Sequence, residues 1–161
     1  MKKKNFTILP FIFMILINGC TGYKTIFNSS SLKLEIKNHT IEGDKKLGKR
    51  MYMKLSNSLK TQSEGDKKKI DLLIDITKKI ETTIKSQTGN ILEYKITLNT
   101  ILNVKNYETG NLILNKTYTN SLSYKIQDQY SETISAKNKA IDNLIDQTYQ
   151  ELLISLIQNI T

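Results

Sequence analysis

The sequence is poor in the residues from which disulfides, metal sites and nucleophilic active sites are built. Its 161 residues include one cysteine, Cys20, one histidine, His39, and no tryptophan. A single thiol leaves no intramolecular disulfide to form. One histidine without a second cysteine excludes a zinc site and a Ser-His or Cys-His arrangement, so we interpret His39 as a surface loop residue. The seven glycines form neither a GxGxxG motif nor a P-loop, and nothing indicates nucleotide binding.

The first twenty residues have the organisation of a bacterial lipoprotein signal. Three lysines precede an apolar run over residues 6–17, which is too short and too early for a convincing membrane span. The run ends in Ile-Asn-Gly before Cys20, and this matches the lipoprotein cleavage box. We therefore expect a signal peptide over 1–19 and a diacylated, palmitate-bearing Cys20 at the new N-terminus. The alternative is an ordinary cleaved signal with an incidental cysteine.

The residue after Cys20 indicates the destination of the protein. An aspartate there retains bacterial lipoproteins in the inner membrane, and this chain has Thr21 instead. We expect an outer-membrane lipoprotein, lipid-anchored on the periplasmic side. Residues 20–31 are interpreted as the lipidated cysteine and a tether, and residues 32–161 as a single α/β domain.

Lysine dominates the charge of the chain. The formal net charge is +9, and it falls to +6 without residues 1–19, which carry three lysines and no acidic residue. Residues 21–69 hold a surplus of seven positive charges, whereas residues 70–161 are nearly neutral. Such a surface suits anionic partners such as lipid phosphates, and the envelope compartment argues against nucleic acid. The alternative is a solvated background that reflects an AT-rich coding bias.

The first part of the mature chain predicts a strand followed by an amphipathic helix. Alternating apolar and charged residues over 32–37 indicate a strand with one buried face. A loop over 38–43 follows, and Asp44 is expected to cap the helix. The apolar residues of this helix recur every four positions: Leu47, Met51, Leu55 and Leu59. The polar stretch 61–69 breaks the periodicity and is expected to be a loop.

A long antiparallel hairpin is expected next. The period returns to two, and the even positions form one apolar face: Ile70, Leu72, Ile74, Ile76, Ile80, Thr82 and Ile84. Lys78 is the exception, which we place at a bulge or at the rim of the sheet. Residues 86–90 are expected to form the hairpin loop, and residues 92–104 the matching strand.

A fourth strand and a long helix complete the expected fold. Residues 106–111 form a second reversal, and the strand over 112–126 has a diluted apolar face that indicates an edge. Ser131 is expected to cap a helix that runs nearly to the C-terminus. The order β-α-β-β-β-α predicts a two-layer α/β sandwich, in which two helices cover one face of a four-stranded, mostly antiparallel sheet.

The polar face of the hairpin suits binding better than catalysis. Four carboxylates lie at odd positions, opposite the apolar face: Asp71, Asp75, Glu81 and Glu93. We interpret them as solvent-facing residues that balance Lys79, Lys85 and Lys95, and not as a general acid and base. Threonines accompany them: Thr77, Thr83, Thr97, Thr117 and Thr119. We therefore expect no enzyme, no metal and no cofactor, and a surface that binds a partner or is enclosed in a wet environment.

The combined features resemble the LPS-assembly lipoprotein family LptE. The resemblance covers essentially the whole chain and rests on the lipoprotein box, the order of elements and three short echoes. Gly22 and Tyr23 follow the acylated cysteine as a Gly-aromatic pair, residues 89–94 end in Glu-Tyr like the family's hairpin, and residues 135–137 resemble an Ala-Lys segment at the start of its last helix.

The resemblance implies a role inside the LptD β-barrel of the outer membrane, as a plug that assists lipopolysaccharide assembly at the cell surface. A threonine-rich sheet face is compatible with a hydrated barrel lumen. The family's basic residues at the hairpin tip and near the start of the last helix would correspond to Lys85 and Lys137, which are the candidates for contact with lipopolysaccharide phosphates.

An outer-membrane lipoprotein that activates peptidoglycan synthases is the alternative function. Such an activator crosses the periplasm to an inner-membrane enzyme and needs a long tether. The 11 residues from Thr21 to Ser31 reach about 40 Å when fully extended. This short reach favours a partner in the same membrane.

Overall fold

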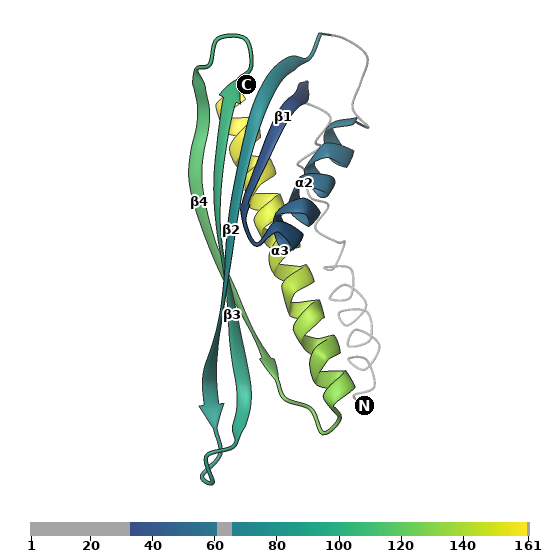
Figure 1. The fold of residues 1–161 in the computed structure, drawn as a ribbon, viewed down its shortest axis with the longest axis vertical. Coiled ribbons are helices and arrows are strands. Elements are labelled where there is room, and N and C mark those ends of the chain that lie inside the picture. Colours follow the sequence, from purple (N-terminus) through teal and green to yellow (C-terminus); the bar gives the residue numbers. More distant parts are fainter. Residues whose placement is uncertain (1–32, 61–65, 161) are drawn as a thin grey trace, which may run out of the picture.

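The computed structural model describes residues 33–60 and 66–160, which form a two-layer α/β sandwich (Figure 1). The sheet has the strand order β1-β2-β3-β4, and both helices pack on one of its faces. Strand β1 runs parallel to β2, and the other neighbours are antiparallel. The elements are β1 (Leu34–Gly43), α2 (Lys45–Lys60), β2 (Lys68–Lys85), β3 (Ile91–Asn106), β4 (Leu112–Lys125) and α3 (Tyr130–Ile160). The predicted architecture and element order are confirmed.

Helix α2 begins where the sequence predicts, because Asp44 caps it. The backbone N–H of Leu47 donates a hydrogen bond to Asp44 Oδ1 at 3.2 Å, which satisfies one free amide of the first turn. Lys78 Nζ lies 2.9 Å from Asp44 Oδ2, and this hydrogen bond holds the pKa of Asp44 below its ordinary value. Lys78 therefore interrupts the apolar pattern of β2 as the partner of the cap, and the register of β2 shifts only beyond Thr82. The predicted apolar stripe is buried: Leu47, Met51, Leu55 and Leu59.

Strand β1 is longer than the alternation over 32–37 predicts. The loop expected over 38–43 is wrong, because these residues continue β1 and pair with β2. Their side chains are mostly exposed at the edge of the sheet, so backbone pairing holds them and the sequence shows no hydrophobic period. His39 is exposed, as expected, but lies in this strand and not in a loop. Its ring stacks on Tyr52 of α2, with 3.9 Å between the centroids.

The buried face of β2 ends halfway along the strand. Its even positions are buried as far as Ile76, whereas Ile80 and Ile84 are 37% and 47% exposed, and Thr82 is exposed as well. The prediction of burial for these three residues is wrong because α2 starts beside Ile76 and runs back along β1, so it does not cover the far half of β2 (Figure 1). Strand β2 also begins at Lys68, inside the stretch expected to be a loop.

Strand β4 lies at the far edge of the sheet, as predicted, and α3 packs mainly on it. Helix α3 begins at Tyr130, so Ser131 lies inside its first turn and is not the cap. Thr133 Oγ1 instead accepts a hydrogen bond from Gln127 N–H at 2.9 Å and ties the first turn to the preceding loop. The apolar face of α3 is buried at Ile141, Leu144, Ile145, Leu152 and Leu156. Within the described ranges, no helix has both the length and the apolar character to cross a membrane.

Candidate functional site

The sheet face that the helices leave uncovered, here called the open face, is polar over most of its length. Thr77, Asn99 and Thr119 form one cross-strand row of this face, and Thr119 Oγ1 donates a hydrogen bond to Asn99 Oδ1 at 2.8 Å. Leu73 and Ile101 are its apolar members. The other hydroxyl and amide side chains of the open face belong to β3 and β4: Thr97, Asn103, Asn115, Thr117, Ser121 and Ser123. The polar sheet face expected from the sequence is therefore present.

The four hairpin carboxylates have separate surroundings. Glu81 pairs with Lys79 at 2.8 Å, and this hydrogen bond lowers the pKa of Glu81. Asp71 accepts a hydrogen bond from an asparagine of β1 at 3.0 Å, and Glu93 accepts one from a threonine of β2 at 2.9 Å. Asp75 differs from the expectation, because its Oδ1 is buried without a hydrogen-bond partner among the described residues. Over ranges 33–60 and 66–160, no three potential metal ligands come together.

The two candidate lysines lie toward the same end of the molecule, here called the hairpin end, where β2 and β3 meet (Figure 1). Lys85 is the last residue of β2 and is exposed, whereas Lys137 lies in the second turn of α3 and is half-buried. Neither forms an ion pair with another described residue. Both ammonium groups are therefore available to an external anion. Cys20 lies outside the described residues.

Exposed apolar side chains accompany the lysines at the hairpin end, and the sequence did not indicate them. They come from β2, β3, β4, the β4–α3 connection and the start of α3, where Tyr130 is the most exposed at 81%. The others are Ile80, Ile84, Leu92, Leu122 and Ile126, which are 37–47% exposed. A surface that combines cations with apolar groups suits an amphiphile that carries anionic groups.

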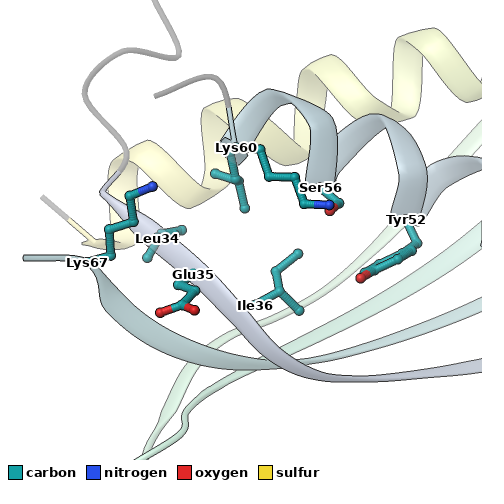
Figure 2. Close-up of a pocket in the computed structure, with 8 residues that line it drawn as sticks. Leu34, Glu35, Ile36, Tyr52, Ser56, Lys60 and Lys67 are labelled. Carbon is teal, nitrogen blue, oxygen red and sulfur yellow. The ribbon is translucent and has the colours of Figure 1, made fainter. Parts of the chain in front are cut away.

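A pocket of about 590 Å³ lies between β1 and α2, near the ends where β1 begins and α2 stops (Figure 2). Its lining includes the apolar side chains Leu34, Ile36 and Leu59. Glu35 of β1 and Tyr52 and Ser56 of α2 line it as well. Two lysines from different elements complete the lining: Lys60 from the end of α2 and Lys67 from the approach to β2. This pocket was not predicted, because it forms only when residues on both sides of 61–65 come together.

The contact between β4 and α3 is partly polar, which explains why the apolar face of β4 is diluted. Asn120 is buried and its Nδ2 donates a hydrogen bond to Thr148 Oγ1 at 3.0 Å. Lys116 Nζ donates to Ser155 Oγ, also at 3.0 Å. Burial raises the pKa of Tyr118, which lies between these two positions on β4. The Tyr118 hydroxyl has no hydrogen-bond partner among the described residues, whereas Asn120 and Lys116 find theirs within this contact. The contact between β4 and α3 therefore serves the fold more than a ligand.

Comparison with known proteins identifies the fold. No family model matches the sequence, and no curated protein matches it. Among solved structures, a putative lipoprotein from Caulobacter crescentus CB15 matches with a TM-score of 0.57 at 12% identity, over 80% of this chain and 92% of that one. A minor lipoprotein from Acinetobacter baumannii matches with 0.53 at 17% identity, over 78% and 94%. An uncharacterized lipoprotein B from Nitrosomonas europaea matches with 0.53 at 11% identity, over 85% and 92%. The chain therefore shares the fold of solved bacterial lipoproteins.

Proposed function

We propose that the protein is a non-enzymatic outer-membrane lipoprotein, anchored through Cys20 on the periplasmic side, that plugs the LptD barrel and assists lipopolysaccharide assembly. The lipoprotein box of the sequence and the fold in common with bacterial lipoproteins support the anchored state. The family resemblance supports the barrel partner.

The polar open face is the observation that carries the proposal. An ordinary two-layer domain has a free sheet face in bulk water, and a hydrated barrel lumen offers a similar environment while allowing hydrogen bonds to lumen-facing side chains. Hydroxyl and amide groups such as Thr77, Asn99 and Thr119 can donate and accept without the desolvation cost of buried charges. The 18 residues of β2 extend over roughly 60 Å, so the domain is long enough to pass through a barrel.

The hairpin end is the proposed contact for lipopolysaccharide. Lys85 and Lys137 are free of ion pairs within the described ranges, and the exposed apolar side chains beside them suit the acyl region of the ligand. Because the contact rests on charge pairing, it weakens as salt screens the phosphates.

Affinity capture of the detergent-solubilised, full-length lipoprotein from its own membranes tests the barrel partner. We expect mass spectrometry to identify a large outer-membrane β-barrel in stoichiometric amount. The Cys20→Ser variant is the control for anchoring and should remain unprocessed or soluble. Recovery of a cell-wall synthase would instead support the activator function, and recovery of no partner would contradict the plug.

Charge reversal tests the lipopolysaccharide contact separately. The double variant Lys85→Glu and Lys137→Glu should bind lipopolysaccharide at least about tenfold more weakly, since two charge-assisted contacts are lost. The matched control is Lys46→Glu with Lys49→Glu, because both residues are exposed on α2 away from the hairpin end. Equal affinity of the two double variants would reject the assigned contact site.

A further inference from the structure

The end of the domain opposite the hairpin brings together four distant parts of the chain. The N–H of Lys68 donates a hydrogen bond to the carbonyl of Lys33 at 2.9 Å, and the N–H of Tyr107 donates to the carbonyl of Lys69 at 3.0 Å. The last residue of α2, Lys60, reaches the same region and lines the pocket there. We call this the entry end, because the described chain begins here, at Lys33.

The entry end is strongly cationic. Seven lysines lie here: Lys33, Lys37, Lys60, Lys67, Lys68, Lys69 and Lys105. Four described carboxylates lie here as well: Glu35, Asp66, Glu108, and Asp71, which is in register with Lys105. Lys37 pairs with Glu35 at 2.7 Å and Lys69 with Glu108 at 3.0 Å. Five lysines therefore keep an ammonium group that is not paired with any described carboxylate.

Apolar groups lie beside these cations. Tyr107 and Leu112 flank the β3–β4 turn and are 47% and 57% exposed. The pocket between β1 and α2 adds Leu34, Ile36 and Leu59 to the same lining as Lys60 and Lys67, together with the acidic Glu35 (Figure 2). An exposed aromatic ring, an exposed aliphatic side chain and unpaired lysines on one surface are the combination that binds at the boundary of lipid headgroups and acyl chains.

The position of the proposed anchor points this surface at a membrane. Lys33 lies thirteen positions after Cys20, and this segment fully extended reaches about 45 Å. The entry end therefore stays within this reach of the headgroups, whereas β2 leads a further 18 residues away to the hairpin end. A tether of this length keeps the local concentration of lipid headgroups high at the entry end.

We propose that the entry end docks on anionic phospholipids of the membrane that holds the anchor, through Lys33, Lys60, Lys67 and Lys68 with Tyr107 and Leu112 at the headgroup boundary. The proposal rests on the acylation of Cys20 given above. Docking holds the entry end at the headgroups of that membrane.

A tryptophan probe tests the contact, because the chain contains no tryptophan of its own. The full-length acylated Leu112→Trp protein is reconstituted into vesicles of equimolar phosphatidylethanolamine and phosphatidylglycerol with brominated acyl chains. We expect its emission to shift to the blue and to be quenched at least twofold compared with the same vesicles without bromine. Both effects should be lost at ~1 M salt, where the screening length is about 3 Å, and in vesicles of pure phosphatidylcholine.

Two controls separate docking from mere proximity to the bilayer. Leu92 is 46% exposed and lies at the hairpin end. A tryptophan at this position, Leu92→Trp, should therefore not be quenched. Adding Lys60→Glu and Lys67→Glu to the Leu112→Trp protein should abolish quenching, whereas adding Lys46→Glu and Lys49→Glu should leave it unchanged. A Tyr107→Trp probe repeats the measurement at the second exposed position.

The outcomes distinguish the inference from its premise. If the protein floats with the vesicles while the Leu112→Trp and Tyr107→Trp probes stay unquenched, the anchor holds and the docking inference is overturned. Equal quenching of the Leu92→Trp probe, or quenching in pure phosphatidylcholine, also overturns it. If the protein carries no acyl mass and does not float, the proposed anchor fails and the inference falls with it.

Discussion

The junction between β1 and α2 allows a stringent test of the packing, because it depends on a glycine. Gly43 has φ of +65° and is the last residue of β1, in register with Ile76. A Cβ at this position would lie far inside the van der Waals radius of the Ile76 carbonyl oxygen and 2.6 Å from Asp75 Oδ1. The aspartate side chain can rotate away, but the carbonyl oxygen cannot, since it accepts the hydrogen bond from Asp44 N–H at 2.7 Å.

The expected cost of Gly43→Ala has two parts. An L-residue in the left-handed region costs about 1–2 kcal/mol, and forcing a methyl group into an occupied, well-packed site costs about 1–3 kcal/mol more. We therefore expect the free energy of unfolding to fall by about 3 kcal/mol, out of the roughly 5–15 kcal/mol typical of a domain. Gly89→Ala is the matched control, because Gly89 has φ of +85° and its Cβ would meet nothing within 4 Å.

Urea unfolding of residues 21–161, followed by circular dichroism, measures both variants under one condition. Gly89→Ala should cost about 1 kcal/mol, which reports the backbone conformation alone. The difference between the two variants then reports the contact with the Ile76 carbonyl. If Gly43→Ala costs no more than Gly89→Ala, the parallel pairing of β1 with β2 does not extend to Gly43 in the way described.

The same assay checks three further consequences. Asp44→Asn should lower stability by less than about 1 kcal/mol at neutral pH, because it keeps a capping side chain but loses the ion pair with Lys78. The folded pKa of Asp44 lies below its usual 3.8, so this difference should be full above that pH and disappear as the pH falls through the folded pKa. Gly48→Ala would place a Cβ against Ile41 Cγ2 and should stabilise α2, by about 1 kcal/mol, only in an Ile41→Ala background. Leu152→Ala, at a fully buried position, should lower the free energy of unfolding by about 2–5 kcal/mol. A smaller decrease would contradict the packing of α3 on the sheet.

Much of the fold was predictable because, over most of the chain, the faces that are apolar in the sequence are the faces that other elements cover in the structure. The apolar residues spaced by four from Leu47 to Leu59 form the face of α2 that is buried. Asp44 caps the helix through a hydrogen bond to a residue three positions later. The even positions of β2 record the covered half of the sheet as far as Ile76. At these positions, local preference and global packing specify the same structure.

The wrong predictions arise where the local sequence pattern and the global packing differ. Residues 38–43 have no hydrophobic period because β1 is an edge strand, and its backbone pairing with β2 leaves no signature in the side chains. Ile80 and Ile84 keep the apolar pattern of a buried strand, but α2 starts beside Ile76 and runs back toward the beginning of β2, so it does not cover them. They are exposed at the hairpin end because of where α2 starts, and the sequence of β2 alone cannot predict that position.

The sequence by itself predicted a lipoprotein signal, and it determined the element order and most of the amphipathic faces, because each depends on residues that are close together in the chain. Tertiary structure alone decided the pocket between β1 and α2, the gathering of lysines at the entry end and the cross-strand register of the polar open face. The physical reason is that parallel pairing of β1 with β2 brings Lys33 beside Lys68, which lies 35 positions later in the chain. Charge that is dispersed along the sequence becomes a surface only after that pairing.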